Sequence, residues 1–333
     1  GCDWSSDVCS SDLTKKYLLG QALFFDPILS GNRDVSCATC HLLHHGTSDA
    51  LPRSIGVGGL GLGKSRRLDG AIIEHPRNSL DLWNRDNNSV KSLFWDGRVE
   101  ALDRKKRTFR SPLGDSLPDG LQNVLAVQAL FPLARADEML GKPGDRSASN
   151  LPIEHADRPN KLAGSAVFKQ GAQRITAVHD AIIGRRLGEF RYEQADWQLE
   201  YQQLFLEAYP GKRIANITIV DLANAIAHFE EIAFATRNTP WDRYVAGDLE
   251  AITESAKSGA IIFFGKGRCA VCHSGPLFSD FEFHSLAVSQ RDPETGAERV
   301  DLGRYLVTKI DSDLYKFRSE ERRVGKECRS RWS

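Results

Sequence analysis

The spacing of apolar residues along the chain predicts short helices in its first half. From 15 to 25, apolar residues recur at a spacing of four, and Asp26-Pro27 ends the pattern. A similar pattern over 121–128 ends at Phe131-Pro132. The sequence therefore predicts one helix in each of these segments.

Two longer helices are predicted in the second half of the chain. Thr218 and Asp221 have the spacing of a capping box, and an apolar stripe continues from them to Ala233. Another helical pattern runs from 253 to 264 and leads into a segment that contains two cysteines. Alternation typical of strands is scarce throughout, so the expected fold class is mainly α.

The length of the chain and its loop signals predict two domains. The 333 residues suffice for two domains of roughly 150 residues each. We expect one domain over 14–200 and the other over 201–317, joined somewhere between 191 and 213. Pro, Gly, Ser and Asn without periodicity over 141–161 predict a long surface loop.

The two ends of the chain are predicted to be non-native. Residues 1–13 and 318–333 match neither a helix, a strand nor a signal peptide, and they resemble translated sequencing adapters. A pair of polar, disordered tails is the alternative. The first interpretation implies that the domain over 201–317 is truncated.

Charge and hydropathy exclude two classes of function. Lys and Arg total 44, as do Asp and Glu, so the net charge is zero and nothing favours nucleic-acid binding. The longest apolar run, over 260–264, is far shorter than the roughly 20 residues that a membrane span needs. No membrane span is therefore expected.

The cysteines carry the most specific chemical signal in the sequence. Without the two terminal segments, four of the seven cysteines remain, and all four lie in two copies of C-x-x-C-H. The copies comprise Cys37, Cys40 and His41, and Cys269, Cys272 and His273. At this spacing two thiols can each add to a vinyl group of one haem, and the adjacent imidazole can become an axial iron ligand. The sequence therefore predicts two covalently bound haem c groups.

The cysteine pairs have three other interpretations. The pairs could form one four-cysteine zinc site, a thioredoxin-like redox pair, or disulfides of a secreted protein. None of these requires His directly after the second Cys, yet His occupies that position both times. Haem is therefore favoured, and because covalent haem attachment takes place outside the cytoplasmic membrane, we expect a periplasmic protein.

A glycine-rich run gives a competing signal. The segment over 58–65 matches the phosphate-loop pattern G-x-x-x-x-G-K-[ST]. Neither a buried strand before it nor a long helix after it is predicted, so we interpret the match as chance.

Beyond the two haem motifs, several runs together resemble the bacterial di-haem cytochrome c peroxidases, which include the MauG-type enzymes. The resemblance covers nearly all of 14–317. The runs are Leu19-Gly20-Gln21-Ala22-Leu23-Phe24-Phe25-Asp26-Pro27, Pro76-Arg77-Asn78-Ser79, Phe94-Trp95-Asp96-Gly97-Arg98, Phe131-Pro132 with Glu138-Met139, and Asp301-Leu302-Gly303-Arg304-Tyr305.

The resemblance implies two cytochrome c-like haem lobes. Hydrogen peroxide would be reduced to water at the amino-terminal haem, and the carboxy-terminal haem would relay electrons. The donor would be a small cytochrome c or a cupredoxin, and the chain would be able to form a homodimer. Two alternatives remain: a MauG-type enzyme that oxidises a partner protein, and a di-haem electron carrier without peroxidase activity.

The resemblance also assigns roles to individual residues. His41 and His273 would be the proximal iron ligands. Glu138 would be the distal acid that moves the peroxide proton, and Pro132 would pack in the same pocket; without the resemblance, Glu138 would be interpreted as an ordinary exposed acid.

Two further roles concern the space between the lobes. Trp95 would pass electrons from one haem to the other, and Asn78 would offer its amide oxygen to a calcium ion. A core tryptophan and a turn asparagine are the respective alternatives.

The sequence departs from the family pattern after Ser54-Ile55-Gly56. Many di-haem peroxidases have there a histidine that ligates the first iron in the resting oxidised state, whereas this chain has Val57. Valine cannot bind iron, so the resemblance implies a first haem that is open without prior reduction, as in the MauG-type branch. The remaining histidines are interpreted as solvent or turn residues: His44, His45, His75, His155, His179, His228 and His284.

A second departure concerns the end of the chain. The family continues past Tyr315-Lys316-Phe317 with further calcium ligands and with the other axial ligand of the second haem, a Met or a Tyr. Met139, the single methionine, is assigned to the pocket of the first haem instead.

Overall fold

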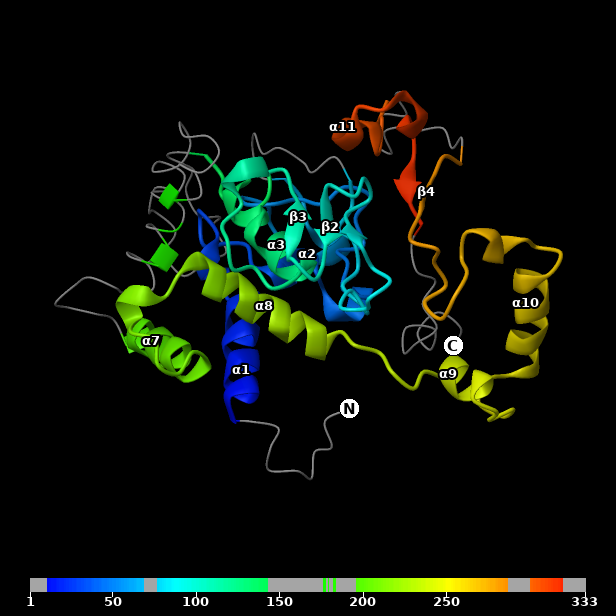
Figure 1. The fold of residues 1–333 in the computed structure, drawn as a ribbon, viewed down its shortest axis with the longest axis horizontal. Coiled ribbons are helices and arrows are strands. Elements are labelled where there is room, and N and C mark those ends of the chain that lie inside the picture. Colours follow the sequence, from blue (N-terminus) through cyan, green and yellow to red (C-terminus); the bar gives the residue numbers. More distant parts are fainter. Residues whose placement is uncertain are drawn as a thin grey trace. The chain divides into compact units, whose positions relative to one another are not determined.

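The chain forms two compact units, each of which is described here by itself. The computed structural model describes residues 11–68, 77–142, 176–177, 179, 182–183, 196–286 and 300–319 (Figure 1). The first unit comprises Gly1–Asp86 and Ala101–Phe234, and the second comprises Asn87–Glu100 and Ala235–Ser333.

The first unit is built on α-helices with short helical turns between them. The α-helices are α1 (Ser11–Phe25), α2 (Cys37–Cys40), α3 (Val124–Leu130), α7 (Asp196–Ala208) and α8 (Ile219–Ala233). The 3-10 turns are η1 (Pro27–Leu29), η2 (Leu43–His45), η3 (Gly63–Ser65), η4 (Gly114–Ser116), η5 (Pro132–Ala134) and η7 (Ile214–Asn216).

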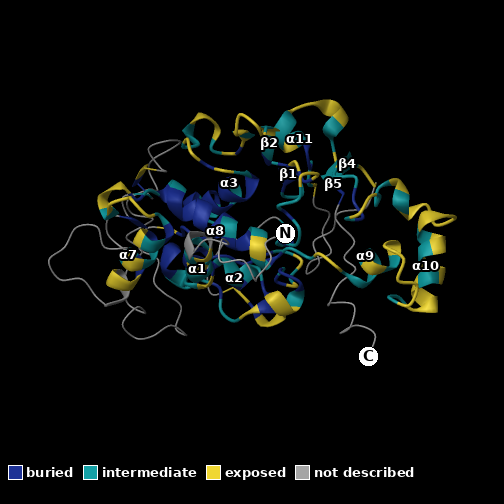
Figure 2. Cartoon of the chain, turned by 60° about the horizontal axis from the view of Figure 1, so that its bottom comes forward, coloured by how far each residue is buried: buried dark blue, intermediate teal, exposed yellow. Residues whose placement is uncertain are grey.

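The core of the first unit lies where α8 crosses α1 and packs on α3 (Figure 1). At the crossing with α1, a Cβ on Gly20 would lie 2.0 Å from the main-chain oxygen of Ala225, so only glycine allows this approach. Phe24, Phe229 and Phe234 pack against one another in tilted and edge-to-face arrangements, with ring centroids 5.1 to 5.6 Å apart. In Figure 2 buried residues accordingly gather on α3 and α8.

The helices predicted from apolar spacing are present. The pattern over 15–25 falls within α1, and the pattern over 121–128 corresponds to α3, whose Asn123 caps the first turn by accepting from the Ala126 amide. Thr218 and Asp221 form the predicted capping box of α8. The prediction of a mainly helical chain is confirmed.

A buried carboxyl group lies on α8. Glu230 is 4% exposed, and no hydrogen-bond donor among the described residues reaches its Oε2. Burial, and secondarily the charge of Glu231, raises the pKa of Glu230 to about 8 from an ordinary value of 4.5. The native protein therefore holds a proton here that the unfolded chain releases at lower pH.

This proton makes stability depend on pH. Between pH 4.5 and about 8 the native state binds more protons than the unfolded state, so the free energy of unfolding falls as the pH rises. The slope is at most about 1.4 kcal/mol per pH unit for one group. Glu230→Gln is expected to remove this loss, so its advantage over the parent chain grows with pH. Urea unfolding at several pH values measures this free energy. Glu200→Gln, at an exposed acid of α7, is the control and should keep the pH dependence of the parent. If the free energy of unfolding changes with pH equally in Glu230→Gln and the parent, the prediction is wrong.

The second unit contains shorter elements. Its helices and turns are α9 (Pro240–Val245), α10 (Glu254–Phe264), η8 (Cys269–Val271), α11 (Tyr305–Thr308) and η9 (Asp311–Asp313). β4 (Phe283–His284) pairs antiparallel with β5 (Phe317–Arg318), with Phe283 opposite Arg318. The predicted helix over 253–264 is α10, which Thr253 caps and which has no buried residue (Figure 2).

The segment Asn87–Glu100, which contains β1 (Ser92–Leu93) and the turn that leads into β2 (Val99–Asp103), also belongs to the second unit. β1 pairs antiparallel with β2, with Leu93 opposite Val99, and β3 (Thr108–Arg110) follows in the sheet order β1-β2-β3. The Arg304 guanidinium donates to the carbonyls of Asp96 and Gly97 and to the Glu100 carboxylate, at 3.1, 2.7 and 2.8 Å.

The units divide at a different place from the boundary predicted at 200. The first unit continues to Phe234, because α7 and α8 pack on α1 and on α3 rather than on the segments that follow them. The segment Asn87–Glu100 joins the second unit, where Arg304 binds its hairpin. Apolar periodicity locates helices but does not say which neighbour a helix covers.

The predicted tails and the predicted loop lie largely outside the described residues. α1 begins at Ser11, three residues before the predicted start of native sequence at Thr14. Arg318 belongs to β5, and the buried Ser319 follows it. Strand pairing uses main-chain hydrogen bonds, so a residue of a predicted non-native tail can pair in a strand. Of the loop over 141–161, Gly141 and Lys142 are described. None of the described helices is both long and apolar enough to cross a membrane.

Candidate active site

The first C-x-x-C-H motif forms a single helical turn. α2 carries Cys37 and Cys40, and the His41 amide donates to the Cys37 carbonyl at 3.0 Å, which closes the turn. Ser36 and Thr39 cap its start. The four cysteines of the two motifs are free thiols. This turn therefore presents two available thiols and one imidazole from five consecutive residues.

The environment of His41 fits an axial haem ligand. Its Nδ1 lies 2.9 Å from the main-chain oxygen of Thr47. A carbonyl can only accept, so Nδ1 carries the proton and Nε2 keeps the lone pair that a metal needs. Burial lowers the pKa of His41, which favours the neutral, ligating form. The ring is therefore held in the tautomer and charge state that iron ligation requires.

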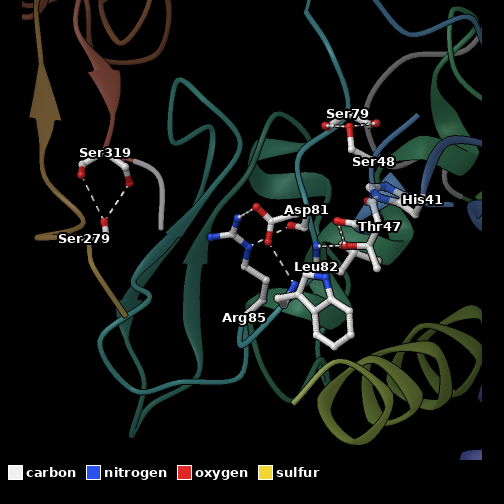
Figure 3. A network of polar contacts seen from close by, with 11 residues as sticks. His41, Thr47, Ser48, Ser79, Asp81, Leu82, Arg85, Ser279 and Ser319 are labelled. Carbon is white, nitrogen blue, oxygen red and sulfur yellow. Dashed lines mark hydrogen bonds and ion pairs between the residues drawn. The ribbon is translucent and has the colours of Figure 1, made fainter. Parts of the chain in front are cut away.

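A network of hydroxyl groups lies behind this ring (Figure 3). Thr47 Oγ1 accepts from the Leu82 amide at 2.7 Å and donates to the Gly46 carbonyl. Ser79 Oγ donates to the Cys40 carbonyl at 2.8 Å and accepts from the Asp49 amide at 3.0 Å. These contacts fix Thr47 and Cys40, and thereby the orientation of His41, as hydrogen bonds around metal-binding histidines usually do.

Ser79 is a site residue that the sequence analysis did not assign. It belongs to the Pro76-Arg77-Asn78-Ser79 run, from which only Asn78 had been given a role. The one sequence feature that could have indicated a site role for Ser79 is its position next to Asn78 in this run. The structure links this run to the haem motif through the Ser79 hydroxyl, whereas Asn78 itself is half-buried and its calcium role stays a prediction.

The thiols of the first motif do not suit redox chemistry of the thioredoxin kind. Burial raises the pKa of Cys37 far above its ordinary value and raises that of Cys40 to about 12. A redox-active C-x-x-C pair needs a thiolate near neutral pH, and therefore a lowered pKa. The electrostatics favour haem attachment over a thioredoxin-like pair.

The structure brings Val57 and Glu138 together. The Val57 amide donates to the main-chain carbonyl of Glu138 at 2.8 Å, and the Val57 side chain is buried. A Cβ on Gly56 would lie 2.3 Å from the Asp137 carbonyl, so the two chain segments touch along their backbones. The residue at the departure from the family pattern thus adjoins the predicted distal acid.

Glu138 also belongs electrostatically to the first motif. Its charge acts on both Cys40 and His41, where it opposes the loss of a proton. Arg135 Nε lies 3.5 Å from Glu138 Oε1, and the same guanidinium binds Asp137. The Glu138 side chain is 14% exposed, so it is not the ordinary surface acid of the alternative interpretation.

The neighbours of Glu138 come from the same short segment. Pro132 begins η5 and is half-buried. Met139 is buried, and its carbonyl accepts from the Gly31 amide at 2.6 Å. The predicted pocket residues Pro132, Glu138 and Met139 therefore lie within one compact turn region of the first unit.

The loop that contains the glycine-rich run over 58–65 surrounds a cation of the chain itself. The carbonyls of Ile55 and Gly56, which precede the run, and of Gly61, which lies within it, accept from the Arg66 guanidinium at 2.8, 2.6 and 2.9 Å. A phosphate loop instead turns its amides inward. The three carbonyls form a cradle for Arg66, which favours the interpretation of the sequence match as chance.

The second motif repeats the anchoring of the first. His273 Nδ1 lies 3.0 Å from the Phe278 carbonyl, so the same tautomer argument leaves Nε2 for iron. The Cys272 carbonyl accepts from Ser319 Oγ at 2.8 Å, as the Cys40 carbonyl accepts from Ser79. Both motifs therefore fit a haem by the same criterion, a histidine whose Nδ1 is fixed by a main-chain oxygen.

His284 has a specific partner in the second unit. Its Nε2 lies 2.8 Å from Asp280 Oδ2, and with Cys272 these residues form a cluster of potential ligands within 4.8 Å of one another. The sequence predicts a solvent or turn residue at His284, and the hydrogen bond to Asp280 gives it a more specific contact. A thioether at Cys272 would remove the thiolate from this cluster.

Trp95 lies in the turn between β1 and β2. It is half-buried, and its carbonyl accepts from the Arg318 amide at 2.8 Å. Gly97 in the same turn has φ +66°, and a Cβ there would lie 2.4 Å from Arg304 Nη1, so the turn requires glycine. Trp95 thus belongs to the unit that carries the second motif, and its role between the haems stays a prediction.

Comparison with known proteins gives a consistent result. A sequence model described as di-haem cytochrome c peroxidase matches residues 14–250. The cytochrome c peroxidase of Escherichia coli is 29% identical over 300 residues, which cover 90% of this chain and 45% of that protein. The methylamine utilization protein MauG of Methylorubrum extorquens is 27% identical, over 82% of this chain and 53% of that protein. Cytochrome c551 peroxidase of Pseudomonas aeruginosa is 25% identical, over 90% and 62%.

Solved structures agree at the level of the fold. A MauG-like protein associated with microbial copper homeostasis has a TM-score of 0.57 at 21% identity, over 92% of this chain and 68% of that chain. The diheme peroxidase BthA of Burkholderia thailandensis has a TM-score of 0.55 at 18% identity, over 92% and 64%. The chain spans between 45% and 62% of the length of the three curated relatives. Because the family match extends over well more than half of the chain, this protein belongs to the di-haem cytochrome c peroxidase family.

Proposed function

We propose that this chain reduces hydrogen peroxide to water at its first haem motif. The observation that carries the proposal is the hydrogen bond from the Val57 amide to the Glu138 carbonyl. This bond joins the backbone of the proposed distal acid to the residue that stands where many relatives have an iron ligand. A simple electron carrier has no use for a vacant iron position next to an acid.

The overall reaction consumes two electrons and two protons for each peroxide and yields two water molecules. Haem, when bound through Cys37, Cys40 and His41, supplies the iron that binds peroxide and exchanges the electrons. The chain supplies the proton transfer: a Glu138 carboxylate oxygen takes the proton from the near peroxide oxygen and delivers it to the far one, which leaves as water. Arg135, at 3.5 Å, holds that carboxylate in place.

Electrons would enter through the second motif. Haem bound through Cys269, Cys272 and His273 would relay them, and Trp95 would serve the transfer between the two groups. The donor would be a small cytochrome c or a cupredoxin, and the compartment would be the periplasm, where c-type haem is attached. A calcium ion at Asn78 and a homodimer belong to the same proposal.

The second candidate function uses the same site on another substrate. A MauG-type enzyme would withdraw electrons from a partner protein instead of from a small donor. Val57 favours this candidate, because it offers no second ligand to the first iron, and the similarity to MauG of Methylorubrum extorquens supports it. The two candidate functions differ in the source of the electrons: a small redox protein for the peroxidase, and an oxidised partner protein for the MauG-type enzyme.

The state of the first haem tests the proposal. In protein matured in a host that attaches c-type haem, we expect two haems per chain and a high-spin component in the oxidised spectrum, because Val57 cannot ligate iron. Peroxide should be consumed without prior reduction. Val57→His should convert that component to low spin and slow the reaction of the oxidised form, while Val57→Ile should change neither. A parent protein that is entirely low-spin, or that leaves peroxide untouched, would overturn the proposal.

A further inference from the structure

We propose that Arg66 is a positioning residue of the peroxide site: by filling the carbonyl cradle of the loop over 55–61, it fixes Val57 against Glu138. The inference rests on the proposed function for its consequence on peroxide, and on contacts in the first unit for its physical basis. Arg66 touches no substrate, so it acts through the loop.

The cradle is complete and buried. All three nitrogens of the Arg66 guanidinium are used: Nε donates to the Ile55 carbonyl at 2.8 Å, Nη2 to Gly56 at 2.6 Å and Nη1 to Gly61 at 2.9 Å. Arg66 is 5% exposed. A planar cation with separated donors can bind carbonyls on both sides of the loop at once, which a lysine ammonium cannot do.

Acidic groups lie near the Arg66 guanidinium. Burial lowers the pKa of Arg66, and the charges of Cys40, Asp34 and Asp49 oppose this shift. Asp34 also binds the loop itself, because its Oδ2 accepts from the Gly58 amide at 2.6 Å. The loop is therefore held from two directions, by a cation on its carbonyls and by an anion on an amide.

The loop carries this constraint to the acid. Gly56, whose carbonyl binds Arg66, has its α-carbon against the backbone of Asp137 and Glu138. The next residue donates its amide to the Glu138 carbonyl at 2.8 Å. Ile55, on the other side, shares its carbonyl between Arg66 and the Cys40 thiol, which lies 3.9 Å away. Arg66 thus binds the residue that directly precedes Val57, and it shares the Ile55 carbonyl with Cys40 of the first motif.

The consequence is a distal loop that stays in place. Without the guanidinium, the Gly61 carbonyl would lose the donor that Arg66 supplies, and the Ile55 and Gly56 carbonyls would keep only the longer contacts from the Cys40 thiol, at 3.9 Å, and the Gly59 amide, at 3.3 Å. The loop can bring these carbonyls to water only by moving. That movement would displace Val57 and shift the Glu138 backbone. A displacement of about 1 Å can lower a rate about 100-fold when a proton has to be delivered to one atom.

Three variants test this in the full haem-loaded chain. Arg66→Met removes the donors, Arg66→Lys keeps the charge with a single donor atom, and Arg67→Met is the matched control at the adjacent, exposed arginine. Hydrogen exchange of the Val57 and Gly58 amides is measured first. We expect Arg66→Met to speed their exchange about 10-fold or more, Arg66→Lys to have an intermediate effect, and Arg67→Met to have none, with exchange in α1 and α8 unchanged.

A double-variant cycle then shows whether the effect passes through the acid. Arg66→Met alone should slow peroxide reduction by up to about 100-fold, but it should add little in a Glu138→Gln background, because the acid that it positions is already gone. Unchanged exchange in the loop, or a full additional loss in that background, would overturn the inference. If the parent chain leaves peroxide untouched while loop exchange responds as expected, the proposed function fails and the positioning of the loop by Arg66 stands.

Discussion

Replacing Glu138 with glutamine is expected to lower peroxide turnover by about 100- to 10,000-fold, the range that one general acid-base group contributes. Glutamine keeps the shape of the side chain and its place beside Val57 but can neither take nor deliver a proton. Stopped-flow mixing of the oxidised protein with peroxide measures the step directly. The haem content and the spectrum of the second haem should not change.

Asp137→Asn is the matched control for this variant. Asp137 is the neighbouring acid and binds the same Arg135 guanidinium, and the amide oxygen of asparagine can still accept from that guanidinium. Its loss should leave the rate close to that of the parent. Peroxide reduction at full rate in Glu138→Gln would remove the acid-base role that we assign to Glu138.

The second large effect is expected from replacing both thiols of the second motif. Cys269→Ala with Cys272→Ala should reduce the haem content from two groups per chain to one, because no thiol is left in that motif for covalent attachment. The first haem should keep its spectrum and should still react with a single equivalent of peroxide. Continuous turnover with an external electron donor should be lost, because the proposed entry point for electrons is missing. A pyridine haemochrome assay with mass spectrometry gives the count.

The reciprocal variant separates this result from a general failure to mature. Cys37→Ala with Cys40→Ala should retain one haem, in the second unit, and should not react with peroxide. If the protein were only an electron carrier, each double variant would still lose one haem. Neither the parent nor either variant would then consume peroxide. A parent chain that carries zinc and no haem would contradict both predictions.

Part of this architecture could be predicted from the sequence because it depends on side-chain chemistry at fixed spacing. The capping box of Thr218 and Asp221 and the C-x-x-C-H turn of Cys37 depend on three- or four-residue contacts, which a single sequence displays directly. Glu138 was found through a family resemblance, since an acid after Arg135-Ala136-Asp137 is otherwise typical of a surface turn.

The remainder depends on contacts between distant segments. That α8 closes the first unit follows from the approach of Ala225 to Gly20, more than 200 residues away along the chain. The Arg66 cradle consists of carbonyls, which every residue has, so no letter of the sequence marks it. Ser79 likewise shows its role only once its hydroxyl meets the Cys40 carbonyl.

The main-chain anchors of His41 and His273 have an evolutionary consequence. In many metalloproteins a carboxylate side chain holds the outer nitrogen of the ligand, and a single codon change can abolish that support. Here the acceptors are the peptide oxygens of Thr47 and Phe278, which survive any substitution at those two positions. Natural variation can thus alter the side chains around each imidazole without withdrawing the bond that sets its protonation.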